Sequence, residues 1–487
     1  EAKEPLKVLQ EIPSRLKQLS VFIIRDVLSK LANEQYIVVN LLLAPVLALF
    51  IAYFTKYYDA LDVEKPQYIF YYNNNIPVYF FMSVVVALFV GLIVSAEEIF
   101  KDRKILRREK YLQLSRGSYL LSKVIILFTL SAIQTITFIL VGNLILGIPF
   151  SEMRYWLILF SCSCFANILG LNISSAFDSA VTIYILIPIL IIPQLLLSGV
   201  VISFDKFNPN VGRPNGIPVM GELMASRWAF EAYMVTQFKD NPYEREFYEA
   251  DKKEAIAEYK RVFYIPALES RLAKVLHSPN HWRDIREDNP VKNNLDLLRT
   301  EINYEMALLG ENKFPEVELL QVGKFDSVVY EKTAAFLNVL KKYYTLRLSN
   351  AIKDREAKIA RLTSTPEKLE AFNNFRLRHA NESVTRMVEN ANEPSRIVEW
   401  HGELIQKVYP IYFNEHRPKN RFDFTTNFFS PDKHFLGRTF DTYYFNIAMI
   451  WFMVLVLYIA LYYDWLSKLV NSISTWQKYR RKKKIEF

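Results

Sequence analysis

Six long apolar segments limit what this chain of 487 residues can fold into. A helix needs about 20 predominantly apolar residues to cross the hydrocarbon core of a bilayer. The segments are Tyr36–Phe54, Pro77–Ser95, Tyr119–Leu146, Tyr155–Phe177, Ala180–Ile202 and Tyr443–Tyr463. Tyrosine and tryptophan lie at many of their ends, which is typical of side chains at the membrane interface. We therefore predict an all-α polytopic membrane protein, with five clustered transmembrane helices and a sixth far downstream.

The composition indicates two populations of sequence, one very apolar and one highly charged. Hydrophobic residues make up 51% of the chain and charged residues 23%. The net charge of +9 could indicate nucleic-acid binding, but the basic residues lie next to the apolar segments. Cations that flank membrane helices and contact anionic lipids explain this distribution better. We expect membrane lipids, and no nucleic acid, among the partners.

A basic loop between the second and third apolar segments sets the orientation. Between Val94 and Lys123, lysine and arginine outnumber aspartate and glutamate, and short loops of this kind stay in the cytoplasm. An even number of spans then places both termini in the cytoplasm, in agreement with the basic tail Lys478–Lys484. The loop Lys56–Ile76 is free to lie outside. Residues 204–440 fall on that same side, as a large and mainly helical extracytoplasmic insertion.

Five regions follow from this topology. They are an interfacial connecting helix at 1–35, the first five spans at 36–203 with a cytoplasmic loop at 97–118, an external re-entry segment at 204–240, a periplasmic helical domain at 241–440, and the last span with its tail at 441–487. Helical spacing in the insertion predicts helices at Tyr243–Phe263, Val291–Leu309 and Ser327–Leu362, from Ser364 to about Asn390, and from Asn392 to near Tyr409. Arg421–Phe429 is the one plausible strand.

The segment Ser14–Glu34 mixes apolar residues with arginine and lysine upstream of the first span. This pattern favours a helix that lies in the cytoplasmic interface of the membrane. The alternative is an ordinary surface helix of a cytoplasmic domain that precedes it. Because the chain starts at Glu1 without a signal peptide, we expect it to be the remainder of a longer polypeptide.

Three motifs in this order resemble the permease half of ABC-2 type ABC transporters, closest to the G (white-like) subfamily. They are Asp102, Arg108-Glu109 and Tyr119-x-x-x-Lys123 in the basic loop, Pro193–Gly199 (Pro-x-x-Leu-x-Ser-Gly) at the end of the fifth span, and Arg227–Ala232 (Arg-Trp-Ala-Phe-Glu-Ala) after it. The segment Ser14–Glu34 is also similar to the connecting helix of that family. The insertion after Glu231 is far larger than is usual in the family.

The resemblance implies the permease of an ATP-driven exporter, assembled as a dimer of two copies with twelve spans. No G-x-x-x-x-G-K-[ST] motif occurs in the chain, so it cannot hold ATP by a P-loop. ATP and Mg would bind a cytoplasmic ABC ATPase domain, fused upstream or separate. The chain itself is expected to carry no cofactor and no catalytic residue.

The resemblance also assigns roles to particular residues. Coupling to the ATPase would fall on Asp102, Arg107, Arg108, Glu109, Tyr119 and Lys123. Arg227, Phe230 and Glu231 would form the external re-entry site. The alternative for the basic loop is that its cations only enforce topology and bind anionic lipid. That alternative does not explain the acids Glu97 and Glu98, which would face the same anionic surface.

Polar residues inside the spans are candidates for lining a translocation path. Ser163, Asn167 and Ser174 fall on one face of the fourth span, and Gln134 lies in the third. Small and polar stripes of this kind also mediate close helix packing, which is the alternative we favour. Because no ionisable residue lies in the middle of a span, ion-coupled transport is disfavoured and an amphipathic or apolar substrate is expected.

The insertion carries no catalytic signature. It has no H-E-x-x-H motif, and we expect no metal site. Cys162 and Cys164 both lie in an apolar segment, so no disulfide framework supports the insertion, which suits a bacterial inner membrane. Two other functions stay open. The chain could be a membrane-anchored interaction protein with a periplasmic partner, or an ABC machine that pulls on its external domain without transport.

Overall fold

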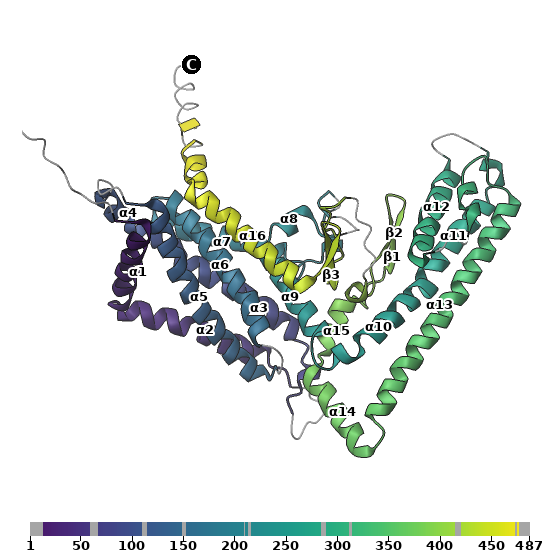
Figure 1. Cartoon of the computed structure of the whole chain (residues 1–487), viewed down its shortest axis with the longest axis horizontal. Coiled ribbons are helices and arrows are strands. Elements are labelled where there is room, and N and C mark those ends of the chain that lie inside the picture. Colours follow the sequence, from purple (N-terminus) through teal and green to yellow (C-terminus); the bar gives the residue numbers. More distant parts are fainter. Residues whose placement is uncertain are drawn as a thin grey trace, which may run out of the picture.

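The computed structural model describes residues 13–58, 67–109, 114–148, 152–208, 210–212, 216–283, 289–310, 314–413, 420–472 and 475–476, with the backbone alone at Arg107, Glu109, Glu152 and Pro290. The predicted basic tail Lys478–Lys484 lies outside these residues. The described part is predominantly helical. Figure 1 shows a bundle of long helices and a helical arm that projects from one end of it.

The bundle is built around a close contact between two spans. Its helices are α1 (Arg15–Leu31), α2 (Glu34–Thr55), α3 (Ile76–Ala96), α4 (Glu98–Glu109), α5 (Arg116–Leu146), α6 (Glu152–Ala176), α7 (Ala180–Leu196), α8 (Val219–Glu222), α9 (Ala225–Lys239) and α16 (Thr442–Tyr462). α3 packs along α6, α2 along α5, and α16 against both α6 and α9. A Cβ on Gly170 would lie 2.0 Å from Ser95 Oγ. Glycine therefore lets α6 approach α3 closely.

Five helices among the described residues are long and apolar enough to cross a membrane. They are Glu34–Thr55, Ile76–Leu106, Arg116–Leu146, Met153–Ala176 and Thr442–Tyr462. The predicted span Ala180–Ile202 forms the shorter apolar helix α7, which contains Pro188 and Pro193 and stops before the predicted end. Beyond it Gly199 has a φ of +80°, and a Cβ there would lie 2.5 Å from the Phe204 ring. The count of six spans stays a prediction, with α7 as the sixth candidate.

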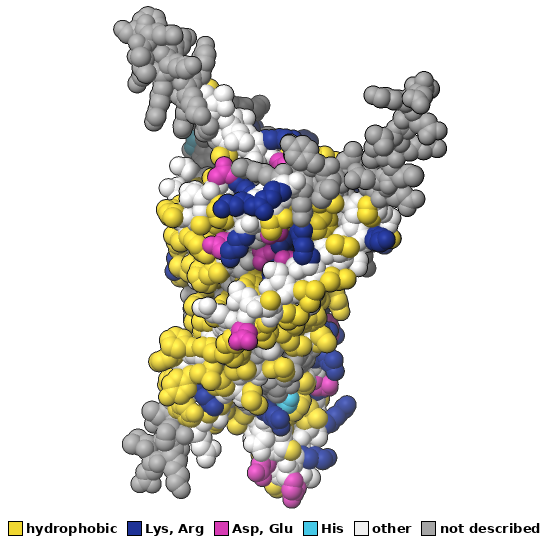
Figure 2. Space-filling view, turned by 90° about the vertical axis from the view of Figure 1, so that its left-hand side faces the viewer, with side chains coloured by type: hydrophobic (Ala, Val, Ile, Leu, Met, Phe, Trp, Pro, Cys, Tyr) yellow, Lys and Arg dark blue, Asp and Glu magenta, His cyan; other side chains and the backbone are white. Residues whose placement is uncertain are grey.

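The outer surface of the bundle is apolar over a wide area. Figure 2 shows hydrophobic side chains across the middle of one face, with lysine and arginine gathered above them. On α2 the exposed side chains include Val38, Leu42, Leu49 and Phe50. Apolar patches of this extent mark surfaces that contact a membrane or another protein. The surface fits the predicted polytopic membrane protein.

The arm is dominated by the long helix α13. Its helices are α10 (Glu244–Tyr259), the π-helical turn η4 (Lys260–Tyr264), α11 (Ile265–Leu276), α12 (Pro290–Leu309), α13 (Ser327–Leu362), α14 (Pro366–His379) and α15 (Glu382–Glu389). Short turns are η1 (Phe70–Tyr72), η3 (Phe204–Lys206), η5 (Pro279–His281), η6 (Pro315–Leu319) and η7 (Pro410–Tyr412). α10 and α11 pack against α13 around buried Leu268, Leu298 and Leu337. The predicted helices at Val291–Leu309 and Ser327–Leu362 are confirmed.

The predicted helix from Ser364 to about Asn390 is wrong in its length. It begins at Pro366 as expected but ends at His379, and α15 follows as a separate helix. Asn381 interrupts it, because its side chain accepts a hydrogen bond from Val384 N at 3.0 Å and so caps α15. The same side chain donates to the carbonyl of Phe70 at 2.7 Å. A local cap and a contact with η1 both favour the break.

The predicted helix Tyr243–Phe263 forms as α10 and η4, which continue into α11. Two β-hairpins replace the other two predictions for the insertion. The predicted helix from Asn392 to near Tyr409 is wrong, because β1 (Ile397–Trp400) pairs there with β2 (Glu403–Gln406). His401 and Gly402 have φ values of 51° and 77°, as a two-residue type I′ turn requires.

The predicted strand Arg421–Phe429 is also wrong. The second hairpin comes after it and joins β3 (Asp432–Phe435) to β4 (Arg438–Asp441). Leu436 and Gly437 form its turn, again with positive φ. The insertion is therefore mainly helical, with two short hairpins.

The two ends of the bundle gather different segments. At one end lie α1, α4, the start of α5 and the end of α16, where Arg116 pairs with Asp464. At the other end η1 contacts α14 and α15. η1 belongs to the loop that joins the first two spans, and α14 and α15 belong to the insertion; these two parts, both predicted outside, therefore lie at the same end. The predicted cytoplasmic loop lies at the opposite end.

Candidate functional site

Helix α4 contains the segment predicted to couple the spans to an ATPase, and α6 caps its first turn. The backbone N–H groups of Ile99 and Phe100 donate to Ser174 Oγ at 3.0 and 2.9 Å. N–H groups in the first turn of a helix have no partner within that helix. Ser174, a candidate for lining a path, thus serves in this structure to hold α4 against a span.

Arg103 of α4 in turn bonds to backbone carbonyls at the end of α6. Its guanidinium donates to the carbonyls of Ser174 and Ser175 at 3.1 and 2.7 Å, and it pairs with Asp178. Carbonyls in the last turn of a helix lack partners within the helix, and a cation there is stabilising. Each helix therefore satisfies unpaired backbone groups of the other.

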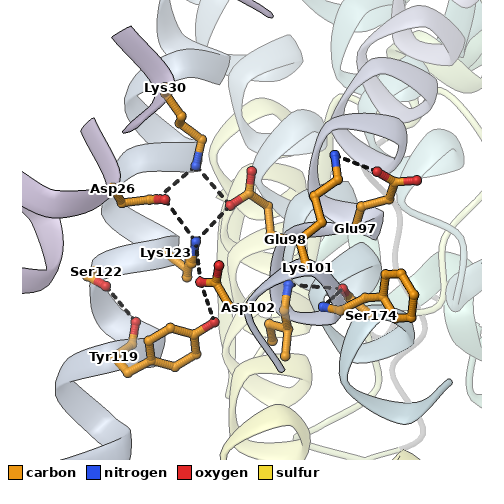
Figure 3. Close-up of polar contacts among 12 residues, drawn as sticks. Asp26, Lys30, Glu97, Glu98, Lys101, Asp102, Tyr119, Ser122, Lys123 and Ser174 are labelled. Atoms are coloured by element: carbon orange, nitrogen blue, oxygen red, sulfur yellow. Dashed lines mark hydrogen bonds and ion pairs between the residues drawn. The ribbon is translucent and has the colours of Figure 1, made fainter. Parts of the chain in front are cut away.

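The buried Lys123 side chain lies at the centre of ion pairs between α1, α4 and α5 (Figure 3). Its Nζ lies 3.0 Å from Asp26 Oδ1, 3.0 Å from Glu98 Oε2 and 2.9 Å from Asp102 Oδ2. Only 3% of the side chain is exposed. Lys30 Nζ lies 2.8 Å from both Asp26 and Glu98. We call these five residues the Lys123 cluster.

The Lys123 cluster places three carboxylates around two ammonium groups. Tyr119 adds a hydroxyl that donates to Asp102 at 3.0 Å. Burial raises the pKa of Asp26, but Lys123 and Lys30 outweigh burial and hold that pKa below its usual value. The carboxylate of Asp26 is therefore ionised at neutral pH. Separation of the three helices would leave buried charges without partners, which is costly.

The structure brings together three of the residues predicted for coupling, namely Asp102, Tyr119 and Lys123. Arg108 lies exposed on α4 and takes no part in the cluster. The side chains of Arg107 and Glu109 lie outside the described part of the chain.

Sequence reasoning missed Asp26, Lys30 and Glu98. The spacing of Asp26 and Lys30, four residues apart in an amphipathic segment, was a usable signal because it places both on one helix face. It does not reveal which partner that face meets.

A second buried cluster joins α9 to α16 and to β3 of the second hairpin. Glu231 lies 3.2 Å from Arg227, and Lys433 Nζ of β3 lies 2.7 Å from Glu231 Oε1. Asn446 Nδ2 of α16 donates to Glu231 Oε2 at 2.9 Å, and Arg227 also pairs with Glu222 at 3.2 Å. Glu231 and Lys433 are fully buried. We call these five residues the Glu231 cluster.

Two of the three predicted re-entry residues, Arg227 and Glu231, belong to this cluster, and the third packs beside it. The ring of Phe230 lies 5.9 Å from that of Phe81 on α3 and 6.1 Å from that of Phe429. Lys433 was missed. Burial lowers the pKa of Lys433 below its usual value, although Glu231 opposes this.

The remaining candidates for path lining make hydrogen bonds between helices. Ser163 Oγ and Asn167 Nδ2 of α6 each lie 2.7 Å from Ser131 Oγ of α5. Gln134 Nε2 of α5 donates to the carbonyl of Asn40 of α2 at 2.9 Å. All of these side chains are buried. The contacts are those that the packing alternative predicts, and path lining stays a prediction.

The helices of the bundle match a known protein family over most of their length. Residues 17–238 match the family model of the ABC-2 type transporter. The match runs from α1 through α9, so this ABC-2 membrane domain contains the whole Lys123 cluster. No curated protein matches the chain. An ABC-2 membrane domain implies a transporter permease component, and such domains generally partner with an ABC ATPase.

Proposed function

We propose that this chain is the permease of an ATP-driven exporter of the G-subfamily type, which moves an amphipathic or apolar substrate across a bacterial inner membrane. The observation that carries the proposal is the anchoring of α4 to three other helices by the Lys123 cluster and by Ser174. The spans lack ionisable residues near their centres, which favours such a substrate over an ion.

In this proposal α4 passes movement from the ATPase to the spans. Lys104 and Arg108 are exposed on α4 and available to a cytoplasmic partner. On the other side of the helix, Glu98 and Asp102 pair with Lys123. A cavity of about 380 Å³ beside α4 gives the movement room. Because breaking a buried ion pair costs about 3–5 kcal/mol, a push on α4 displaces α1 and α5 together with it.

The partners follow from the same reasoning. ATP and Mg bind a cytoplasmic ABC ATPase domain, fused upstream or separate, and a second copy of the chain completes the membrane pathway. Both termini, the connecting helix at 1–35 and the coupling loop at 97–118 lie in the cytoplasm, in contact with lipid. The helical domain at 241–440 is periplasmic.

A second function, force transmission without transport, is favoured by one observation. The insertion is bound to the spans through the buried Glu231 cluster, in which Lys433 comes from β3 and Asn446 from α16. Movement of the spans would therefore reach the insertion and a periplasmic partner. If a variant whose insertion no longer moves still exported substrate, this second function would be excluded.

Arg108→Glu tests the coupling surface. We expect vanadate-sensitive ATP hydrolysis by the complex, purified gently from its native membrane, to fall about tenfold or more, since about 1.4 kcal/mol of lost association suffices. Because Arg108 is exposed, the unfolding temperature should not change. The matched control is Lys353→Glu, which makes the same charge change at an exposed position of α13. Unaltered hydrolysis and unaltered co-purification of the ATPase would remove the proposed docking role of α4.

A further inference from the structure

A large cavity lies where the arm meets the bundle, and no step of the proposed export uses it. It has a volume of about 640 Å³ and is bounded by α10, α13, α14, α15, η1 and η7. The rings of Tyr71, Tyr243, Phe372, Tyr409 and Tyr412 line it. Cavities that hold small organic molecules usually measure about 300–1,000 Å³ and are lined by aromatic rings with a few polar groups. This cavity has the size and the lining of such a site.

The charge of the cavity is strongly acidic. Its carboxylates belong to Glu244, Asp251, Glu254, Glu258, Glu382 and Glu389, against the guanidinium groups of Arg355, Arg376 and Arg386. Two of these cations are already paired, Arg355 with Asp251 at 2.5 Å and Arg386 with Glu382 at 2.7 Å. Arg376 instead donates to Tyr71 OH at 2.6 Å. Four carboxylates therefore face the cavity without an ion pair to a described residue.

Glu244 is the most informative of these four. It lies at the start of α10 and is 9% exposed. Its carboxylate has neither a hydrogen bond nor an ion pair to any described residue, although it lines the cavity. Nearby, Glu389 accepts one hydrogen bond, from Tyr412 OH at 3.2 Å. Arg355 and Arg376 act on Glu244 without pairing with it, so a cation in the cavity would stabilise the ionised form of this carboxyl group.

We propose that this cavity binds an amphipathic organic cation, with Glu244 and Glu389 as its counter-charges and the surrounding aromatic rings against its apolar body. Positively charged groups are attracted to the faces of tyrosine and phenylalanine rings, most strongly where water is excluded. A ligand of this kind matches both the acidic charge and the aromatic lining. The inference does not depend on the proposed transport activity.

Binding of a cation to this cavity depends on pH. Burial, followed by Asp251 and Glu389, raises the pKa of Glu244 to about 8, although Arg355 and Arg376 oppose this. Burial likewise raises the pKa of Glu389 to about 7, with Asp251 and Glu258 adding to it and Tyr412 and Arg355 opposing it. In the empty cavity both groups are largely protonated at pH 6. A cation favours their ionised forms, so its affinity rises from pH 6 to pH 9 and binding releases protons.

The test is binding of ethidium, a fluorescent organic cation, to the full chain in detergent, followed by fluorescence anisotropy. We expect saturable binding that strengthens between pH 6 and 9, and no binding of the anionic dye fluorescein. Glu244→Gln and Glu389→Gln should each weaken ethidium binding about tenfold or more, as loss of a charged partner does. Glu331→Gln on α13, an exposed site outside the cavity, is the matched control and should bind as the unaltered chain does.

The outcomes separate binding from folding. Glu244→Gln should unfold at the same temperature as Glu331→Gln or higher, because it removes a buried carboxyl group that has no partner among the described residues. If Glu244→Gln does not fold, Glu389→Gln decides the question alone. Equal binding of ethidium and fluorescein, affinity that is the same at pH 6 and 9, or full-strength binding by a folded Glu244→Gln or Glu389→Gln variant would each overturn the proposal.

Discussion

Replacing Lys123 with methionine is expected to lower the free energy of unfolding by about 3–5 kcal/mol, as the loss of one partner from a buried ion pair does. Lys123 contacts Asp26, Glu98 and Asp102, which come from α1 and α4. Without it Lys30 still pairs with Asp26 and Glu98, but Asp102 loses its ion pair. Methionine keeps most of the volume, so repulsion between carboxylates dominates the effect. Any complex that still assembles should hydrolyse ATP without moving substrate. The measurement is the unfolding temperature, with ATP hydrolysis by the purified complex.

The control for this prediction is Lys101→Met, on the same α4 helix. Lys101 is 67% exposed and pairs with Glu97 at 2.5 Å, and such surface pairs contribute about 0–1 kcal/mol. A combined Lys123→Met and Asp102→Asn variant should recover part of the loss, because it removes one of the repelling carboxylates. Equal unfolding temperatures for Lys123→Met and Lys101→Met would show that the Lys123 cluster does not hold α4.

Glu231→Gln is expected to have the second large effect, a loss of about 3–5 kcal/mol at the junction of the bundle and the second hairpin. The carboxylate balances Arg227 and Lys433, both of them buried. Glutamine keeps the shape and the contact with Asn446 but leaves two buried cations with Glu222 as their nearest counter-charge. The second hairpin should therefore become accessible to protease. Limited proteolysis, together with the unfolding temperature, measures this.

A matched control lies on the same side of the bundle. Asp240→Asn removes the same charge from the end of α9, where Asp240 pairs with Arg154 at 2.5 Å in a partly exposed position, and should cost about 1 kcal/mol or less. Combining Glu231→Gln with Lys433→Met should restore much of the stability, since it removes one unpaired cation. The account of the junction would be wrong if Glu231→Gln and Asp240→Asn were equally mild.

The sequence predicted the parts of the fold that local patterns determine. Long apolar segments predicted the spans, and the helix at Ser327–Leu362 has the predicted ends because no proline or glycine interrupts it. The first part of the predicted basic loop forms the multiply charged helix α4. Contacts between distant segments determined the features of the fold that local patterns could not predict. Asn381, between α14 and α15, bonds to Phe70, a residue far away in the chain.

The candidate sites divide in the same way. Asp102, Tyr119 and Lys123 were predicted from motifs, and the structure brings them together. Lys433 could not be predicted, because a lysine in a polar stretch resembles a surface residue and its partner Glu231 lies 202 positions away. The β1–β2 hairpin was missed because His401-Gly402 is not among the Asn-Gly and Asp-Gly pairs that signal such turns most strongly.

The central claim is that α4 moves with the ATPase and carries α1 with it. Spin labels on Lys104→Cys of α4 and Leu28→Cys of α1 test both parts by pulsed electron resonance, and Cys162 and Cys164 are too buried to react. With Lys104→Cys alone, the distance between the two copies should shorten by several ångströms when ATP and vanadate are added. When both labels are on one chain and unlabelled chain is added in excess, the distance from α4 to α1 within one copy is measured. This distance should stay the same. The account would be contradicted if a complex that hydrolyses ATP kept the first distance constant, or if α4 moved away from α1.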